Sequence, residues 1–175
     1  MQESAQKHED TAVAALCRDC GLCCNGVLFG SVKLQAKEDG GRLAALGLIV
    51  EGRGRGQFAQ PCSCFDGKLC RIYEDRPAMC RTFECGLLKR VHSNAITIPA
   101  AKRAIREARQ HVRGVMGVLG DLGNRDEHWP LSRRCAQVIA EPLDLTADQR
   151  RLKLRARLMR ALQKLTESIA RDFLK

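Results

Sequence analysis

The chain has 175 residues, 45% of them apolar and 4% aromatic, with a formal net charge of +10. This size suits one ordinary domain, or a compact domain with a helical extension, and the apolar content excludes an intrinsically disordered chain. No run reaches the roughly 20 apolar residues of a membrane-spanning helix, and the polar start MQESAQKHEDTAVAAL does not fit a secretory signal, so we expect a cytoplasmic protein whose thiols stay reduced.

The first half of the chain predicts short elements separated by glycine-rich turns. Residues 9–16 are expected to form a short helix that leads into the first cysteines. Residues 26–34 are typical of a short or bulged strand, because β-branched and apolar residues surround a glycine. Residues 35–46 become helical towards their end, where Gly47 is suited to follow a helix C-terminus. Residues 51–57 predict a flexible basic loop.

The second half predicts long amphipathic helices. Pro99 is well placed as a first helical residue, because its missing N–H would have no partner there. The apolar positions that follow at helical spacing are Ile105, Ala108, Val112, Val115 and Leu119. Glycines at 114, 117 and 120 weaken the far end of this helix, each by about 1 kcal/mol relative to alanine. A short segment around residues 135–140 precedes the last helix.

Thr146 and Gln149 form a capping-box pattern that starts the last helix. Its apolar stripe consists of Leu154, Leu158, Leu162, Leu165, Ile169 and Phe173. Such a stripe is more typical of packing within the protein than of a face for a protein partner. The helix also carries seven basic residues, which are Arg150, Arg151, Lys153, Arg155, Arg157, Arg160 and Lys164. They favour a solvated face over nucleic-acid binding, because few aromatic residues alternate with them to stack bases.

The chemistry of the chain is concentrated in its ten cysteines. Cys17, Cys20 and Cys23 repeat the Cys-x-x-Cys spacing, in which a short loop lets sulfurs converge on one ion. Three thiols at this spacing are typical of iron–sulfur clusters, whose fourth ligand comes from elsewhere. Zinc sites more often combine two Cys-x-x-Cys pairs, and no second pair is present. The spacing therefore slightly favours an iron–sulfur cluster over zinc.

The adjacent pair Cys23 and Cys24 raises the hypothesis of two metal centres. Neighbouring side chains of an extended backbone point to opposite sides, so Cys24 would serve a different ion from Cys23 or bridge two ions. A site of this kind would use eight thiolates, which are Cys17, Cys20, Cys23, Cys24, Cys62, Cys70, Cys80 and Cys85.

A second cysteine-rich stretch contains a predicted helix. Pro77 favours a helix start and Gly86 a stop, which places Cys80 in the first turns. Arg76 and Arg81 can donate hydrogen bonds to the sulfurs of a bound centre. They can equally form ordinary ion pairs with nearby carboxylates.

The pattern Cys-x-x-Cys-x-x-Cys-Cys, followed by CRIYEDRPAMCRTF, resembles the CxxCxxCC cysteine-cluster family, a zinc- or iron-chelating domain (the YkgJ-like proteins). The resemblance covers about residues 17–85 and implies the same eight cysteines as ligands, with Cys64 as a substitute for Cys62. It also implies four signature residues, which are Tyr73, Arg76, Pro77 and Arg81. Cys135 has no counterpart in the family, and a buried apolar role suits it better than a ligand role.

We therefore expect a mainly α protein with short irregular β structure. A metal-stapled, cysteine-rich domain would cover residues 1–96, with a helical region packed on it over residues 97–175. No Ser/His/Asp or Cys/His arrangement stands out, which favours a non-catalytic or redox metal module. The alternatives are an iron–sulfur enzyme or accessory protein, such as a protein-lysine methylase relative, and a zinc-stabilised nucleic-acid-binding module.

Overall fold

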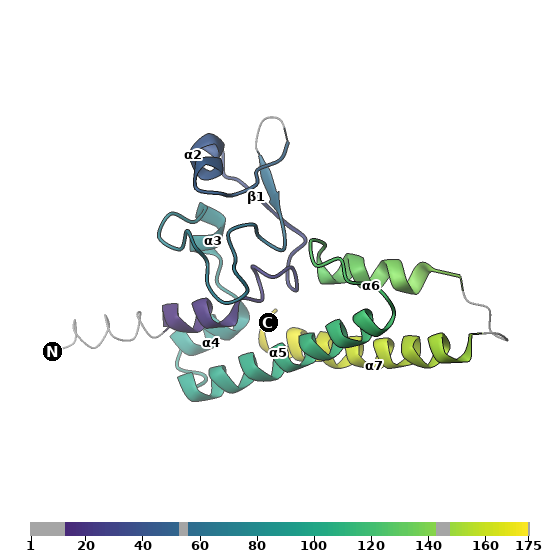
Figure 1. Cartoon of the computed structure of the whole chain (residues 1–175). Helices are drawn as coiled ribbons and strands as arrows, with labels where there is room; N and C mark the ends of the chain where they lie inside the picture. Colours follow the sequence, from purple (N-terminus) through teal and green to yellow (C-terminus); the bar gives the residue numbers. More distant parts are fainter. Residues whose placement is uncertain (1–12, 53–55, 143–147, 175) are drawn as a thin grey trace. The chain divides into compact units, whose positions relative to one another are not determined.

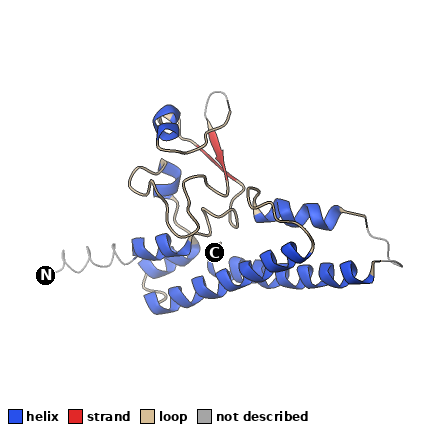
Figure 2. Ribbon diagram, viewed as in Figure 1, coloured by secondary structure: helices blue, strands red, loops and turns tan. Residues whose placement is uncertain are grey.

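The computed structural model describes residues 13–52, 56–142 and 148–174. Over these residues the protein is mainly α-helical with short β structure, which confirms the predicted fold class (Figures 1 and 2). Residues 13–20 are helical. The elements that follow are β1 (Ser31–Lys33), α2 (Gly40–Ala45), β2 (Gln57–Ala59), α3 (Ala78–Thr82), α4 (Gly86–His92), α5 (Ile98–Asp121), α6 (Leu131–Ala140) and α7 (Gln149–Asp172).

The described residues fall into two compact units. Unit 1 takes its residues from Met1–Leu16, Cys85–Asp126 and Arg133–Lys175, and unit 2 from Cys17–Glu84 and Glu127–Ser132. The domain boundary expected at residue 96 stays a prediction. No helix in the described part of the chain has the length and apolar character needed to cross a membrane.

Unit 1 is built around α5 and α7, which lie alongside one another (Figure 1). Ion pairs join Arg171 to Glu107 at 3.2 Å and Arg157 to Asp121 at 4.0 Å, so the two helices run antiparallel. The core positions of α5 at Ile105, Ala108, Val112, Val115 and Leu119 are buried, as are Leu158, Leu165, Ile169 and Phe173 of the last stripe. All five predicted positions of α5 and four of the six in the stripe of α7 are therefore core, whereas Leu154 and Leu162 are half-buried.

The ends of α5 follow local sequence signals. Thr97 is the N-cap and its hydroxyl accepts a hydrogen bond from the Ala100 N–H at 3.4 Å, with Pro99 in the first turn. The helix ends before Gly123, whose φ of 87° suits glycine. The start expected near Pro99 is confirmed, and the helix continues through all three glycines.

Those glycines allow a test of the helical conformation. Gly114 and Gly117 are exposed, and a Cβ added at either position would meet no atom within 4 Å. Gly114→Ala and Gly117→Ala are therefore each expected to raise the free energy of unfolding by about 0.5–1 kcal/mol, because alanine has less backbone freedom to lose. Denaturant unfolding followed by circular dichroism measures this change. A lower stability of both variants would contradict the helical assignment here.

The start of α7 differs from the prediction. Asp148 is the N-cap, and its carboxylate accepts a hydrogen bond from the Arg151 N–H at 3.1 Å. The capping box predicted at Thr146 is therefore wrong as the start of the helix, and Thr146 itself lies outside the described residues. An acidic residue next to the first turn also interacts favourably with the helix dipole, which explains why Asp148 can take this position.

Besides Arg157, which pairs with Asp121, two of the seven basic residues of α7 have partners at the end of α6. Arg151 forms an ion pair with Glu141, and Arg155 donates hydrogen bonds to the backbone carbonyls of Val138 and Glu141. They join α7 to the end of α6 and the residue after it. Of the others, Arg150, Lys153, Arg157, Arg160 and Lys164 are exposed. A nucleic-acid or protein partner for this helix stays a prediction.

Unit 2 contains little regular structure. Strands β1 and β2 pair antiparallel, with Val32 opposite Phe58. The strand expected over residues 26–34 is confirmed only at 31–33, because residues 22–26 form a turn. Strand β2 was not predicted, since three residues are too few for a recognisable alternation. In the loop expected at residues 51–57, residues 53–55 lie outside the described part of the chain.

The apolar core of unit 2 is small. Its buried members are Leu34, Leu43, Leu48, Phe58, Cys64 and Ile72. Helix α2 delivers Leu43 to this core, and Gly47 (φ 94°) turns the chain so that the Leu48 N–H donates to the Leu43 carbonyl at 3.1 Å. This is the C-terminal glycine motif expected at Gly47.

The helix predicted from Pro77 to a stop at Gly86 is wrong at its end. Helix α3 stops at Thr82, and Phe83 is extended, with φ −70° and ψ 123°. The Phe83 ring packs edge-to-face on Phe29, with centroids 5.0 Å apart, and this tertiary contact accounts for the early end. Gly86 begins α4 instead, with Cys85 as its N-cap residue.

Candidate metal centre

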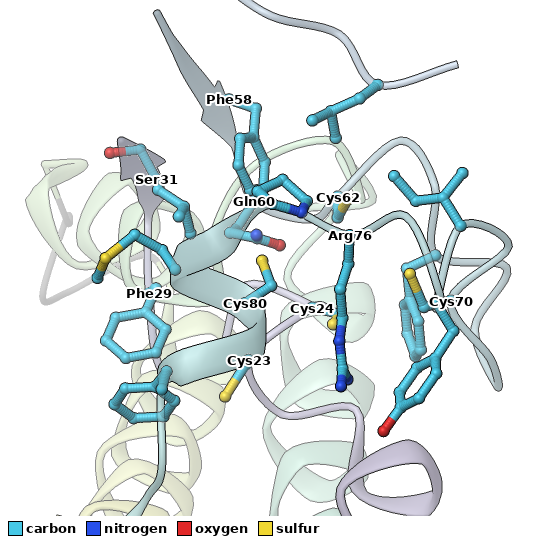
Figure 3. Close-up of a pocket in the computed structure, with 18 of the residues that line it drawn as sticks. Cys23, Cys24, Phe29, Ser31, Phe58, Gln60, Cys62, Cys70, Arg76 and Cys80 are labelled. Carbon is cyan, nitrogen blue, oxygen red and sulfur yellow. The ribbon is translucent and has the colours of Figure 1, made fainter. Parts of the chain in front are cut away.

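Six cysteines line one cavity of about 740 Å³ in unit 2 (Figure 3). They are Cys17, Cys23, Cys24, Cys62, Cys70 and Cys80. They come from three stretches of chain, which are residues 17–24, residues 62–70 and α3. None of the six takes part in a disulfide bond. Figure 3 shows Cys24, Cys62 and Cys80 around the cavity with the Arg76 side chain among them.

A glycine turn positions the first stretch. Gly21 has a φ of 67°, and its carbonyl accepts hydrogen bonds from the N–H groups of Cys24 and Asn25, both at 3.0 Å. A Cβ at Gly21 would lie 2.7 Å from the Phe65 ring, so both the backbone conformation and the space require glycine. Because this backbone is a turn and not a strand, the extended-backbone argument for two metal centres does not apply here, and the number of centres stays a prediction. Cys23 and Cys24 both line the same cavity.

Backbone hydrogen bonds hold the second stretch against this turn. The Cys62 N–H donates to the Cys24 carbonyl at 2.8 Å, which brings two cysteines together that are 38 residues apart. Gly26 fits closely between two prolines, since a Cβ there would lie 3.1 Å from Pro61 and 3.2 Å from Pro130. These contacts fix the position of Cys62 relative to the first cysteines.

Cys62 and Cys64 have different environments. Cys62 lines the cavity, whereas Cys64 does not and is a fully buried member of the apolar core. The Cys64 thiol donates to the Leu46 carbonyl, with a sulfur–oxygen distance of 3.9 Å. Of the two alternatives that the sequence leaves open, these contacts favour Cys62 as the ligand and Cys64 as a core residue.

The remaining cysteines are placed elsewhere. Cys20 is half-buried and is not part of the cavity lining, and Cys85 belongs to unit 1. Cys135, also in unit 1, is only 4% exposed, as expected of a small apolar core residue. The structure therefore brings together six of the eight predicted ligands in one cavity.

Burial and the proximity of the thiols to one another raise their pKa values. Burial raises the pKa of Cys24 and Cys80 to about 12 and that of Cys62 to about 11. For Cys24 the neighbouring thiols Cys62, Cys70, Cys80 and Cys17 raise it further. Near neutral pH these groups are therefore protonated unless a positive charge stabilises the thiolates. A bound metal ion supplies such a charge.

Arg76 already provides part of this charge. Its positive charge opposes the effect of burial on the pKa of Cys70 and Cys80. Its guanidinium lies 3.7 Å from the centroid of the Tyr73 ring, and that of Arg18 lies 5.3 Å from the same centroid. Arg76 and Arg18 both line the cavity, whereas Arg81 does not. Arg18 was missed in the sequence, although its place between Cys17 and Cys20 was a possible signal.

The donor set fits zinc or iron by its chemistry. Both metals accept all-thiolate coordination. Among the described residues, no group of three or more His, Cys, Asp or Glu side chains is arranged to hold an ion. The sulfurs surround the cavity without meeting at one point. Binding would therefore require the thiols to turn about χ1, which moves a sulfur between staggered positions without moving the backbone.

A cavity lined by cysteines in a unit with little regular structure is typical of small metal-binding domains. Residues 16–103 match the family model of CxxCxxCC, whose description is "Putative zinc- or iron-chelating domain". The match covers half of the chain, and the chain belongs to this family, which confirms the resemblance drawn from the cysteine pattern. It extends beyond the expected end at residue 85, through α4 and into α5. Searches of curated proteins and of solved structures gave no match.

Proposed function

We propose that unit 2 is a non-catalytic metal-binding module that holds its metal through thiolates. The observation that carries this proposal is the set of six cysteines outside any disulfide, from three stretches of chain, around one cavity. The ligands would be drawn from Cys17, Cys23, Cys24, Cys62, Cys70 and Cys80. Cys20 and Cys85, the other two predicted ligands, do not line this cavity. The metal supplies bonds that join these stretches and a charge that keeps the thiolates ionised. All-thiolate sites are mostly closed, which favours this role over catalysis.

An iron–sulfur cluster is the favoured occupant, because of the spacing of Cys17, Cys20 and Cys23. Purification without oxygen, followed by metal and acid-labile sulfide analysis, tests this choice. Brown protein with broad visible absorption, iron and sulfide supports the cluster. Colourless protein with stoichiometric zinc would replace the cluster with a zinc site and leave the binding role in place. Protein that takes up neither metal would contradict the proposal as a whole.

Arg76 is proposed to stabilise the thiolate charge. Arg76→Gln is expected to lower metal affinity by about 10–100-fold, the usual effect of losing a partner of the metal ligands. Competition with a chromophoric chelator measures the affinity. Arg81→Gln is the matched control, because Arg81 lies on the same stretch but does not line the cavity. Equal losses in the two variants would contradict a specific role for Arg76.

A further inference from the structure

The cavity in unit 2 is larger than a metal centre requires. Zinc–sulfur bonds are about 2.3 Å long, so an ion held by thiolates occupies a small part of about 740 Å³. The volume is typical of sites for small organic molecules, which occupy cavities of about 300–1,000 Å³. Apart from the cysteines, the walls are mainly apolar and include Phe29, Phe58, Phe65, Ile72, Met79 and Phe83.

Two buried polar atoms of the wall, Gln60 Oε1 and Arg76 Nε, have no hydrogen-bond partner among the described residues, and Gln60 Oε1 is the acceptor of the two. Gln60 is 2% exposed and lines the cavity, and its Oε1 atom accepts no hydrogen bond from any described residue. Its backbone is held, since the Gln60 N–H donates to the Gly30 carbonyl at 3.0 Å. Figure 3 shows the Gln60 side chain among those that line the cavity. A buried acceptor without a donor costs about 1–3 kcal/mol, and a metal ion cannot donate a hydrogen bond to it.

Part of the cavity lining is apolar and exposed to solvent. Met79 and Phe83 line the cavity and are 38% and 36% exposed. The Phe83 ring meets Phe29 at an interplanar angle of 86°, so two ring surfaces border this part of the wall. An apolar molecule entering here would replace water at aromatic surfaces, which is favourable.

The charges of the lining argue against a cationic ligand, because three basic side chains, Arg18, Lys33 and Arg76, line the cavity. No carboxylate lines the cavity in the described part of the chain, so a cation would find no acidic partner. The charge of Arg76 is directed to Cys70 and Cys80 and to the Tyr73 ring.

We propose that this cavity binds a small, mainly apolar, non-cationic molecule beside the metal, and that Gln60 accepts a hydrogen bond from its N–H or O–H group. The molecule packs on Phe29 and Phe83. The proposal adds a ligand to the site of the proposed function, but it rests on the cavity walls and not on the identity of the metal.

Indole and 1-methylindole form a matched pair of probes, because they differ in the N–H donor. Each is titrated into the full chain as isolated, with its metal content measured on the same sample, and binding is followed by ligand-observed NMR. Indole is expected to bind saturably and about fivefold more tightly than 1-methylindole, the effect of one hydrogen bond. Failure of indole to bind, or equal affinity for the two probes, would overturn the proposal.

Two variants locate the binding. Gln60→Leu is expected to reduce indole affinity to that of 1-methylindole, and Phe83→Ala to weaken both probes. Ile49→Ala is the control, since Ile49 is 65% exposed and lies outside the cavity lining. If Gln60→Leu does not fold, Phe83→Ala still tests the proposal. Unchanged binding of both probes to Phe83→Ala would contradict it. If the protein contains metal but does not bind indole, only the proposed ligand site is rejected. If it binds indole but takes up no metal, only the proposed metal-binding function is rejected.

Discussion

Removal of the metal by a chelator is expected to unfold unit 2 and to leave unit 1 folded. In unit 2, helices α2 and α3 have six and five residues and each strand has three. Elements this short are not stable alone, and the buried core beneath them is small. Thiolate–metal bonds would therefore supply much of the folding free energy, as in other small metal domains. In unit 1, α5 and α7 have 24 residues each and share a core of their own.

Hydrogen exchange measured by mass spectrometry separates the two units. After chelation, amides of β1, β2, α2 and α3 should lose protection, while those in the middle of α5 and α7 keep it. Most of the far-ultraviolet helical signal should remain, because the long helices belong to unit 1. Returning the metal should restore protection in unit 2. Persistent protection over residues 17–84 in fully metal-free protein would show that the core, and not the metal, holds this unit.

The features predicted correctly from the sequence depend on neighbouring residues alone. The apolar spacing from Ile105 to Leu119 places one face of α5 in the core, and the glycine at position 47 ends α2. Pro99 similarly marks the first turn of α5. Each of these signals acts within one or two helical turns, so one stretch of sequence contains the whole cause.

The errors arise where distant residues decide the structure. Helix α3 ends early because Phe83 packs on Phe29, a residue 54 positions away in the sequence. The prediction that the Cys23 and Cys24 side chains point to opposite sides assumed an extended backbone. The chain instead turns at Gly21, which packs against the Phe65 ring. The cysteine pattern indicated the metal chemistry. Neither the cavity nor the partnerless Gln60 oxygen could be recognised, because both exist only once the three stretches meet.

Single cysteine substitutions should divide the thiols into ligands and core residues. Cys24→Ser and Cys80→Ser are expected to lower metal affinity by more than the roughly 10–100-fold that an outer partner contributes. The reason is that each change removes a donor, and serine oxygen is a poor substitute for thiolate sulfur with these metals. Metal per chain after gel filtration, and affinity from chelator competition, measure the effect. Cys135→Ser is the control, because Cys135 is buried in unit 1.

The pair Cys62→Ser and Cys64→Ser makes the sharpest comparison, because the two residues lie on the same loop. Cys62→Ser should lose metal. Cys64→Ser should keep it but lower the free energy of unfolding, by about 1–3 kcal/mol, since it places a hydroxyl in an apolar core. The reverse result would make Cys64 the ligand and Cys62 the structural residue. Full metal content in Cys24→Ser, Cys62→Ser and Cys80→Ser alike would mean that this cavity is not the metal site.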